Sequence, residues 1–237
     1  MMRWSAIALG LVLAVVSGCG DDAVTDPQGP PTAGLLAFFP FAGTAADQSG
    51  HGNDGSLLGG ATAVDYLNTR ANDLDALSLP HTLVDGLTDF TIAAWVRISI
   101  LQIGTNQFLS GANATEDNAL GFWYANPEDR WNIRIDGVTY NYDGASTEDG
   151  QWHHVAFVRE AAASTFHMDG SAVGSSIPVP GTAIAVDSGG LIIGQDQDGV
   201  GGSFDATQAW AGQVDNLRFY DRALTPDEID LLVNESQ

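Results

Sequence analysis

The sequence predicts an all-β domain in which two antiparallel sheets pack as a sandwich, with one short helix near the C-terminus. Three observations lead to this prediction. Short apolar or alternating runs recur between turns that are rich in Gly, Asn and Asp. The lengths of these runs, and their content of β-branched and aromatic residues, are typical of strands. Only one segment, TPDEIDLL at 225–232, has a helical pattern.

Eight runs are predicted to be strands, and their spacing fits a sandwich or jelly roll. In the clearest of them, FTIAAWVRI (90–98), the apolar residues from Phe90 to Ile98 alternate on one face, while Trp95 lies on the other. We therefore expect this strand to be buried on both faces, or to line a groove with its second face. The eight runs are LLAFFPF (35–41), FTIAAWVRI (90–98), NALGFWYA (118–125), WNIRIDG (131–137), HHVAFVRE (153–160), TFHMDG (165–170), LIIG (191–194) and QVDNLRFY (213–220).

The predicted helix at 225–232 carries its own start signal. Thr225 is suited to the N-cap and Pro226 to the first helical position. Glu228, three residues after Thr225, completes a capping box. The sequence shows no internal repeat, so we expect one domain that spans residues 34–237.

The first 33 residues have the pattern of a secretion signal followed by a tether. Arg3 precedes the apolar run 6–16, which is too short to span a bilayer comfortably. The small residues before Cys19 resemble a bacterial lipobox. This resemblance implies that residues 1–18 are a lipoprotein signal peptide and that Cys19 is the lipid attachment site. An ordinary signal peptide or an uncleaved anchor is the alternative. The Pro/Gly/Asp-rich segment 19–33 is then a lipidated tether, and the resemblance favours the outer membrane or the cell surface as the location.

The charge of the chain limits its partners. The sequence has 30 Asp and Glu residues, 8 Arg and no Lys, for a formal net charge of −22. Such a surface repels nucleic acid and attracts cations. Cys19 is the only cysteine, so an intrachain disulfide is excluded.

The segment GQDQDGVGGSFDATQ (194–208) gathers acidic and amide side chains around a run of glycines, with strand-like sequence on both sides. Taken alone, it is either a solvated acidic loop or a cation site. An EF-hand does not fit, because Val200 and Thr207 occupy the fifth and twelfth ligand positions when counted from Asp196. A zinc site is not favoured, since the segment has no His or Cys to act as a ligand.

Most of the chain resembles a known family of β-sandwich modules. The segments 34–60, 90–98, 151–160, 166–174 and 211–232 together resemble the laminin G-like, concanavalin A-like jelly-roll modules of bacterial surface proteins. The resemblance covers nearly all of residues 34–235. It implies two curved antiparallel sheets that bind ligands on a concave face or through loops at its rim.

Within this superfamily, residues 191–229 resemble the calcium-dependent pentraxins. The family pattern of Glu-Gln-Asp, then Gly-Gly-x-Phe-Glu, then Gln reads here as Asp-Gln-Asp, Gly-Gly-Ser-Phe-Asp and Gln. An Asp-Asn pair before a Phe-Trp strand supplies the other ligands in the family, and this chain has that pair before Phe122 and Trp123. The resemblance implies a site for two calcium ions, and carboxylate, amide and backbone oxygens are the ligands that Ca²⁺ takes. The implied ligands are Asp117, Asn118, Asp196, the backbone carbonyl of Gln197, Asp198, Asp205 and Gln208.

The same resemblance implies a ligand pocket beside the calcium ions. Its aromatic wall falls at Trp123, with Phe122 as the alternative, although core packing also explains Trp123. Arg134 and Thr139 fall where the family recognises a headgroup, and an Arg there favours an anionic group; a solvated strand residue is the alternative. The internal disulfide of the family is missing, and its positions correspond to Ala93 and Ala156.

A second, structural calcium site is implied by ADQSGHGNDG (46–55), which recurs in laminin G-like modules. Its candidate ligands are Asp47 and Asn53, with Asp215 as a partner near the last strand. The alternative is that Asp and Asn here only form Asx turns.

Catalysis is not expected from the sequence. The laminarinase pattern Glu-x-Asp-x-x-Glu does not occur, and Gln151-Trp152-His153 matches only the first half of an alginate-lyase pattern in a chain without lysine. The chain also lacks a Gly-x-Ser-x-Gly motif. The expected function is therefore a lipid-anchored, calcium-dependent surface module that binds glycans or phosphorylated saccharides. The alternative is an adhesive module that binds a protein partner, in which calcium only stabilises the loops.

Overall fold

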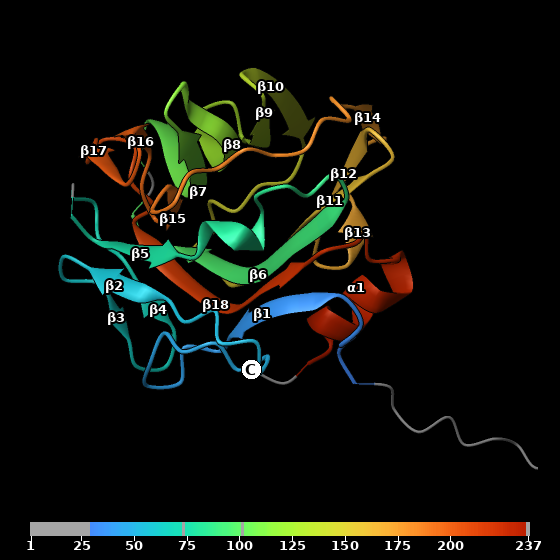
Figure 1. Ribbon diagram of the computed structural model, residues 1–237, viewed down its shortest axis with the longest axis horizontal. Coiled ribbons are helices and arrows are strands. Elements are labelled where there is room, and N and C mark those ends of the chain that lie inside the picture. Colours follow the sequence, from blue (N-terminus) through green and yellow to red (C-terminus); the bar gives the residue numbers. More distant parts are fainter. Residues whose placement is uncertain (1–28, 73, 101, 236–237) are drawn as a thin grey trace, which may run out of the picture.

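The computed structural model describes residues 29–72, 74–100 and 102–235, together with all but one of their side chains, that of Asp117 (Figure 1). The signal peptide, Cys19 and most of the tether lie outside the described residues. Among the described residues, no helix is long and apolar enough to cross a membrane.

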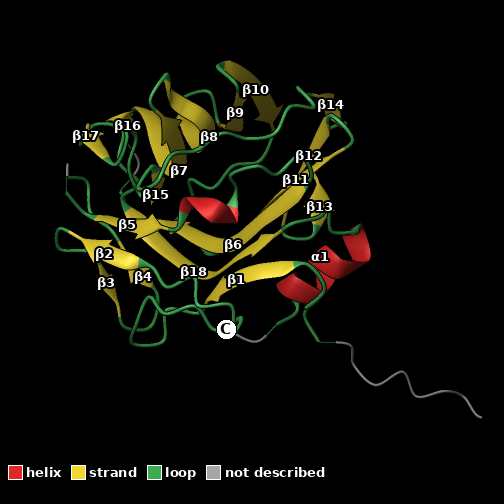
Figure 2. Ribbon diagram, viewed as in Figure 1, coloured by secondary structure: helices red, strands yellow, loops and turns green. Residues whose placement is uncertain are grey.

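Two antiparallel sheets face each other, so the predicted all-β sandwich is confirmed (Figure 2). In the first sheet the order is β13-β12-β11-β6-β18-β4-β3, with β1 against β18 and β14 against β12. Its strands are β1 (Leu35–Phe39), β3 (Thr62–Ala63), β4 (Leu67–Asn68), β6 (Phe90–Ile98), β11 (His153–Glu160), β12 (Ala163–Met168), β13 (Ser171–Ala172), β14 (Ile177–Pro178) and β18 (Gly212–Tyr220).

The second sheet has the order β10-β9-β8-β7-β15-β5-β2, and a separate hairpin, β16-β17, stands beside it. All eight runs expected to be strands lie wholly or mostly in strands. The structure adds several that the sequence did not indicate, above all the long β7. The strands are β2 (Ser56–Leu58), β5 (Ala76–Leu79), β7 (Gly104–Asn113), β8 (Glu116–Asn126), β9 (Arg130–Ile135), β10 (Val138–Asp143), β15 (Leu191–Ile193), β16 (Gln197–Gly199) and β17 (Gly202–Phe204).

Aromatic side chains fill the space between the two sheets. Trp131 on β9 is fully buried, and its ring centroid lies 4.8 Å from that of Phe122, 5.7 Å from Phe166 and 5.9 Å from Trp210. Because β9 alternates, Trp131, Ile133 and Ile135 point into this core, and the residues between them point to the outer face of the second sheet.

Strand β6 is buried on both faces over its first half, which was one of the two outcomes expected from the sequence, whereas Trp95 and Arg97 are half-buried on the outer face. The C-terminal helix α1 (Pro226–Val233) covers the outer face at Ala93 and buries Ile229 and Leu232 against the sheet. Ala93 on β6 lies directly opposite Ala156 on β11. The two positions that the pentraxin resemblance assigned to the missing disulfide are therefore neighbours, and apolar packing under α1 takes the place of a covalent bond.

Helix α1 begins with the predicted capping box. The Thr225 hydroxyl accepts from the Glu228 N–H at 3.3 Å, and the Glu228 carboxylate accepts from the Thr225 N–H at 2.9 Å. Arg222 adds two donors to the same carboxylate, at 2.8 and 2.7 Å. The bonds from Arg222 lower the pKa of Glu228 to about 2, against the smaller opposing effect of burial.

We expect Glu228→Gln to destabilise the protein by about 1 kcal/mol at neutral pH, because the amide keeps the cap but loses the ion pair. Since the folded pKa is depressed, this stabilisation is present above the unfolded value near 4.5 and disappears as the pH falls towards 2. Urea denaturation of both proteins between these pH values measures it. Asp227→Asn, the adjacent exposed acid of the first turn, is the matched control. A deficit for Glu228→Gln that stays constant down to pH 2 would contradict the assignment.

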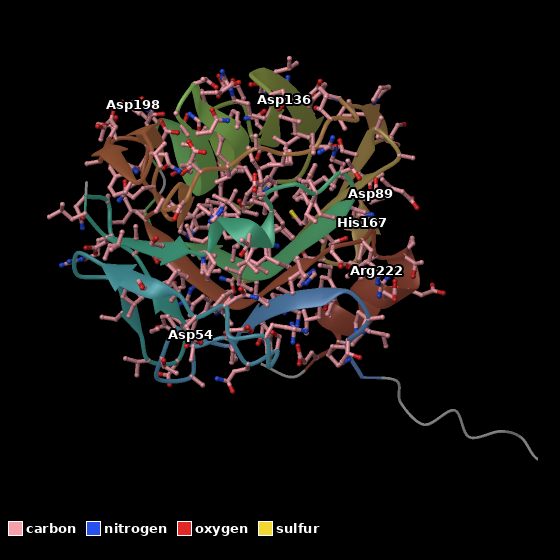
Figure 3. All side chains as sticks on the ribbon, in the orientation of Figure 1. Asp54, Asp89, Asp136, His167, Asp198 and Arg222 are labelled. Atoms are coloured by element: carbon pink, nitrogen blue, oxygen red, sulfur yellow. The ribbon has the colours of Figure 1, made fainter. Side chains whose placement is uncertain are left out.

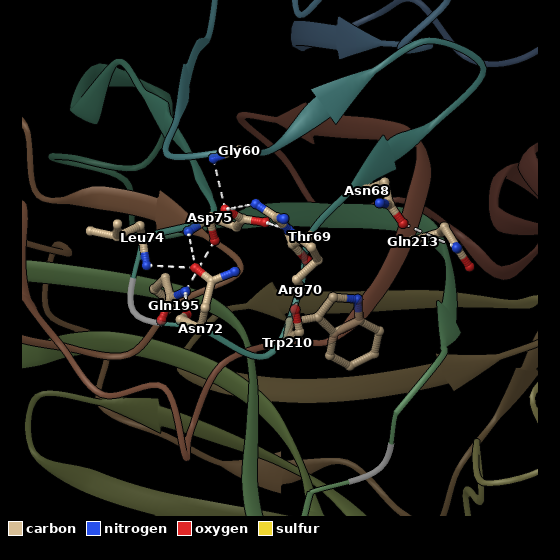
Figure 4. Close-up of polar contacts among 10 residues, drawn as sticks. All are labelled: Gly60, Asn68, Thr69, Arg70, Asn72, Leu74, Asp75, Gln195, Trp210 and Gln213. Carbon is tan, nitrogen blue, oxygen red and sulfur yellow. Dashed lines mark hydrogen bonds and ion pairs between the residues drawn. The ribbon is translucent and has the colours of Figure 1, made fainter.

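The segment 194–208 forms a hairpin, β16-β17, whose base is anchored by buried hydrogen bonds. The Gln195 amide donates to the backbone carbonyls of Asn72 and Asp75, and this contact joins the end of β15 to the loop before β5 (Figure 4). That loop is held in turn by the buried Asp75 carboxylate, which accepts from Arg70 and from the Gly60 N–H. Two residues further along the chain, the Gln197 amide donates to the hydroxyl of Ser110, at 3.0 Å, and to the carbonyl of Gly190, at 2.8 Å. These buried bonds fix both sides of the hairpin base.

Candidate functional site

A pocket of about 170 Å³ lies on the outer face of the second sheet, beside the base of the hairpin. Strands β7, β8 and β9, the segment between β15 and β16, and the segment that follows β17 contribute to it. It brings together three of the implied calcium ligands and both implied ligand-binding residues, although they lie far apart in the sequence. Its lining residues are Thr105, Gln107, Asn118, Trp123, Arg134, Asp196 and Gln208.

Among the described residues that line the pocket, Asp196 is the one with an acidic side chain, and only 7 % of its surface is exposed. Burial raises the pKa of its carboxyl group, a hydrogen bond from Asn118 lowers it, and the charges of Asp198 and Asp205 raise it further. A buried carboxylate with two other carboxylates nearby gains stability from a bound cation.

Asn118 supplies an oxygen that has no partner in the structure. Its Oδ1 atom is buried and accepts no hydrogen bond, while its amide bonds Asp196. A buried acceptor without a donor is costly, and a cation would satisfy it. The carboxylate, amide and backbone oxygens at this place therefore fit Ca²⁺ as the group to be held.

The remaining implied ligands are not all directed at the pocket. Asp198 is exposed at the outer side of the hairpin (Figure 3). Asp205 accepts from the N–H and hydroxyl of Thr207, at 2.8 and 2.7 Å, and the N–H bond is the main cause that lowers its pKa. Among the described side chains, no group of three acidic, His or Cys residues converges on one point, and the side chain of Asp117 is not described.

Gln197 was implied as a ligand only through its backbone carbonyl, and its side chain has another role. The amide holds the hairpin base, and its oxygen accepts from the Gly201 N–H at 2.8 Å. These bonds fix the position of Gln197, which directly follows Asp196.

The side chains of Phe122 and Trp123 point in opposite directions. Phe122 is buried in the core, with 1 % of its surface exposed, whereas Trp123 is half-buried and lines the pocket. Arg134 lies across the strand pair from Gly121, and Thr139 pairs with Arg134 on β10. The aromatic residue on the pocket side is therefore Trp123, and core packing accounts for Phe122.

The sequence did not point to Thr105 and Gln107. Both lie on β7, whose first residues, GTNQ, have the composition of a turn. The Gln107 amide donates to the Leu109 carbonyl at 2.6 Å, beside the bulge that interrupts the pairing of β7 with β8. Only the register of β7 against β8, which is set by tertiary packing, brings these two side chains to the pocket.

The loop 46–55 is saturated by hydrogen bonds of its own. The Asp47 carboxylate accepts from the N–H groups of Phe38, Ser49 and Asn53 at 2.8 to 3.0 Å and from the Ser49 hydroxyl at 2.8 Å. Burial would raise the pKa of Asp47, but these bonds outweigh it and lower the value.

The other two candidates for a second metal have partners elsewhere. Asn53 donates to the Leu36 carbonyl, and Asp215 accepts from the Asn216 N–H, both within described parts of the chain. The described contacts do not join Asp215 to Asp47 or Asn53. This pattern is that of Asx turns, which was the alternative to a second metal.

Comparison with known proteins agrees with this geometry. A laminin G family model, described as the concanavalin A-like lectin/glucanases superfamily, matches residues 71–230. The chain therefore belongs to the concanavalin A-like lectin/glucanases superfamily. Within it, the domain is a jelly roll of the pentraxin-like type.

Two pentraxins show the sequence relationship. The chain is 33 % identical to neuronal pentraxin-2 of Cavia porcellus over 153 residues, which is 62 % of this chain and 34 % of the relative. It is 30 % identical to C-reactive protein 3.3 of Limulus polyphemus over 173 residues, 66 % of this chain and 65 % of that protein. The chain thus spans about a third of the first relative and just under two thirds of the second.

Solved structures show the same fold at lower identity. The heptameric SAP-like pentraxin of Limulus polyphemus superposes with a TM-score of 0.54 at 21 % identity, over 64 % of this chain and 72 % of that one. Domain 4 of the arabinanase AbnA of Geobacillus stearothermophilus, in complex with arabinotriose, gives 0.63 at 18 % identity, over 85 % and 99 %. A mutant of Trypanosoma rangeli sialidase gives 0.67 at 21 %, over 87 % and 33 %. The fold is that of ligand-binding recognition modules, and it also occurs within glycosidases.

Proposed function

We propose that this chain is a calcium-dependent recognition module that binds glycans or phosphorylated saccharides in the pocket beside the hairpin. One observation carries the proposal: Asn118, Asp196 and Gln208 meet there, with Trp123 and Arg134 on the adjacent wall. Trp123 offers an apolar face to a sugar ring, and Arg134 offers a charged donor to an acidic group.

Calcium would be held by oxygens of Asn118, Asp196 and Gln208, with Asp117, the carbonyl of Gln197, Asp198 and Asp205 completing a site for two ions. A bound ion would neutralise the carboxylates and present open coordination positions to ligand oxygens. The structural neighbour in complex with arabinotriose supports a glycan as the kind of ligand that this fold accommodates.

The lining residues favour binding over hydrolysis. Asp196 is the acidic side chain of the described lining, and most glycoside hydrolases need two carboxyl groups about the scissile bond. The proposed function of this pocket is therefore binding without catalysis.

In the cell, we propose that Cys19 carries the lipid and that residues 19–33 tether the domain of residues 34–237 to the outer membrane or cell surface. The described chain begins at residue 29 on the side of the molecule where α1 lies, away from β16 and β17 (Figure 1). A tether that enters there leaves the pocket free to meet ligands.

Calorimetric titration of the purified protein with calcium tests the proposal. We expect saturable binding with a dissociation constant of about 10⁻⁴–10⁻³ M, the range of extracellular calcium modules. A glycan screen with and without chelator should then show calcium-dependent binding that free sugars or phosphomonoesters inhibit. Calcium binding with indifference to both competitors would instead support the adhesive alternative with a protein partner, and no calcium binding would overturn the proposal.

A further inference from the structure

Two arginines differ from the others in their partners. Among the described residues, Arg70, Arg97, Arg159, Arg218 and Arg222 each donate at least one hydrogen bond to an acceptor of the protein. Arg130 and Arg134 donate none within the described part of the chain. Each has only a loose ion pair: Arg130 Nη1 lies 3.8 Å from Asp143 Oδ1, and Arg134 Nη2 lies 3.7 Å from Glu116 Oε1.

Both arginines lie on the same side of the same strand. They are four residues apart on β9, so their side chains share the outer face of the second sheet, about 13 Å apart at a rise of 3.3 Å per residue. Asn132 lies between them on that face and pairs with Trp123 on β8. The row formed by Arg130, Asn132 and Arg134 thus lies along one side of the pocket: Arg134 lines it, Asn132 pairs with the lining residue Trp123, and Arg130 pairs with Ala125, whose partner on β7 is the lining residue Thr105.

Each member of this row has a buried polar atom without a partner. These atoms are Nε of Arg130, Oδ1 of Asn132 and Nε of Arg134. Asn132 as a whole is 97 % buried, because 3 % of its surface is exposed. Buried donors and acceptors are nearly always paired in folded proteins. The three unpaired atoms mark a row that the protein itself does not satisfy, and the partly exposed guanidinium ends of Arg130 and Arg134 leave donors for an acceptor from outside.

On a chain with a net charge of −22, these two guanidinium groups are notable because their nearest carboxylates stand 3.7–3.8 Å away and accept no hydrogen bond from them. Guanidinium groups bind carboxylate, sulfate and phosphate groups through paired hydrogen bonds. Thr139 and Asn141 on β10 pair with Arg134 and Asn132, which adds hydroxyl and amide groups on the same face. Together with Trp123, these groups suit the hydroxyls and the apolar faces of sugar rings.

We propose that the row binds an extended anionic oligosaccharide, a sugar chain whose units carry carboxylate, sulfate or phosphate groups. One acidic unit occupies the pocket beside Arg134, and a later unit of the same chain reaches Arg130. The assignment rests on the proposed function, because it takes the pocket as the primary calcium-dependent subsite. It adds to that function a second subsite and a preference for length and charge.

The test compares acidic sugars of different length in about 1 mM calcium. The probes are galacturonic acid, tetragalacturonic acid, a chondroitin sulfate tetrasaccharide and, as a neutral control, the methyl ester of tetragalacturonic acid. We expect at least one acidic tetrasaccharide to bind about tenfold tighter than the monomer and than the ester, because it reaches both arginines.

The variant Arg130→Gln separates the second subsite from the pocket, since Arg130 does not line the pocket. It should weaken tetrasaccharide binding about threefold to tenfold and leave monomer binding unchanged. Arg97→Gln is the matched control: it removes the same charge from β6, on the other sheet, and should change neither. The melting temperatures of both variants report whether they fold.

Failure of the two proposals can be told apart. The second subsite is wrong if galacturonic acid binds in the presence of calcium and the acidic tetrasaccharides bind no tighter. It is also wrong if the Arg130→Gln variant binds tetrasaccharide like the wild type. Either result leaves the proposed pocket unaffected. Length-dependent and Arg130-dependent binding that persists in chelator would retain the row and overturn the calcium requirement. Binding of none of the acidic probes, or equal binding of the ester or of polyglutamate, would overturn the assignment to anionic sugars.

Discussion

Replacing Asp196 by asparagine is expected to weaken calcium binding at least about tenfold and to raise the melting temperature of the calcium-free protein. Both effects come from one charge. Burial and the charges of Asp198 and Asp205 raise the pKa of Asp196, so its ionised form is unfavourable in the fold without a cation. Asparagine has nearly the same shape and keeps an oxygen for the bond from Asn118, but it carries no charge for calcium.

Two measurements on the same samples check this prediction: calorimetric titration with calcium, and thermal unfolding in chelator. Asp65→Asn is the matched control. Asp65 is exposed in the turn between β3 and β4, so this substitution removes the same charge at a position away from the site. If Asp196→Asn and Asp65→Asn have the same calcium affinity, Asp196 is not a ligand. A lower melting temperature for Asp196→Asn in chelator would show that the buried carboxylate stabilises the fold by itself.

The second large effect concerns two tryptophans on neighbouring strands. Trp131→Ala should lower the free energy of unfolding by about 3–5 kcal/mol, the range for removing a fully buried large aromatic side chain. Trp131 is fully buried and lies at the centre of the aromatic core with Phe122, Phe166 and Trp210. Trp123→Ala should cost less than about 1 kcal/mol, because Trp123 is half-buried on the outer face.

Urea denaturation measures both losses, and a glycan titration of Trp123→Ala completes the comparison. We expect Trp123→Ala to lose ligand binding while it keeps its calcium affinity. If Trp131→Ala does not fold, Trp131→Phe measures the same site with a smaller loss. Equal losses of stability for Trp123→Ala and Trp131→Ala would mean that the outer tryptophan belongs to the core and not to a ligand site.

Local signals in the sequence were enough for the eight predicted strands and the helix. The alternation in FTIAAWVRI predicted β6 to the residue, and Trp95 on its outer face indicated burial on both faces, which α1 supplies at Ala93. The capping box of α1 was readable because its contacts join Thr225 to Glu228 within one turn. Where the local signal was weak, as in the polar start of β7, the strand was missed, because its pairing with β8 comes from the tertiary fold and not from its own composition.

The candidate site divides in the same way. The sequence by itself determined the chemistry: an acidic chain with carboxylate and amide side chains on two separate segments, of which Asn118 and Asp196 are members. Whether those segments meet depends on strand pairings between residues far apart in the chain, which a local pattern does not contain. The family resemblance implied such a meeting, and the tertiary structure brings Asn118, Asp196 and Gln208 into one pocket with Trp123. The tertiary structure also decided that the Asp47 oxygens are used by nearby N–H and hydroxyl groups, because hydrogen bonds compete for a carboxylate only once the fold has placed the donors around it.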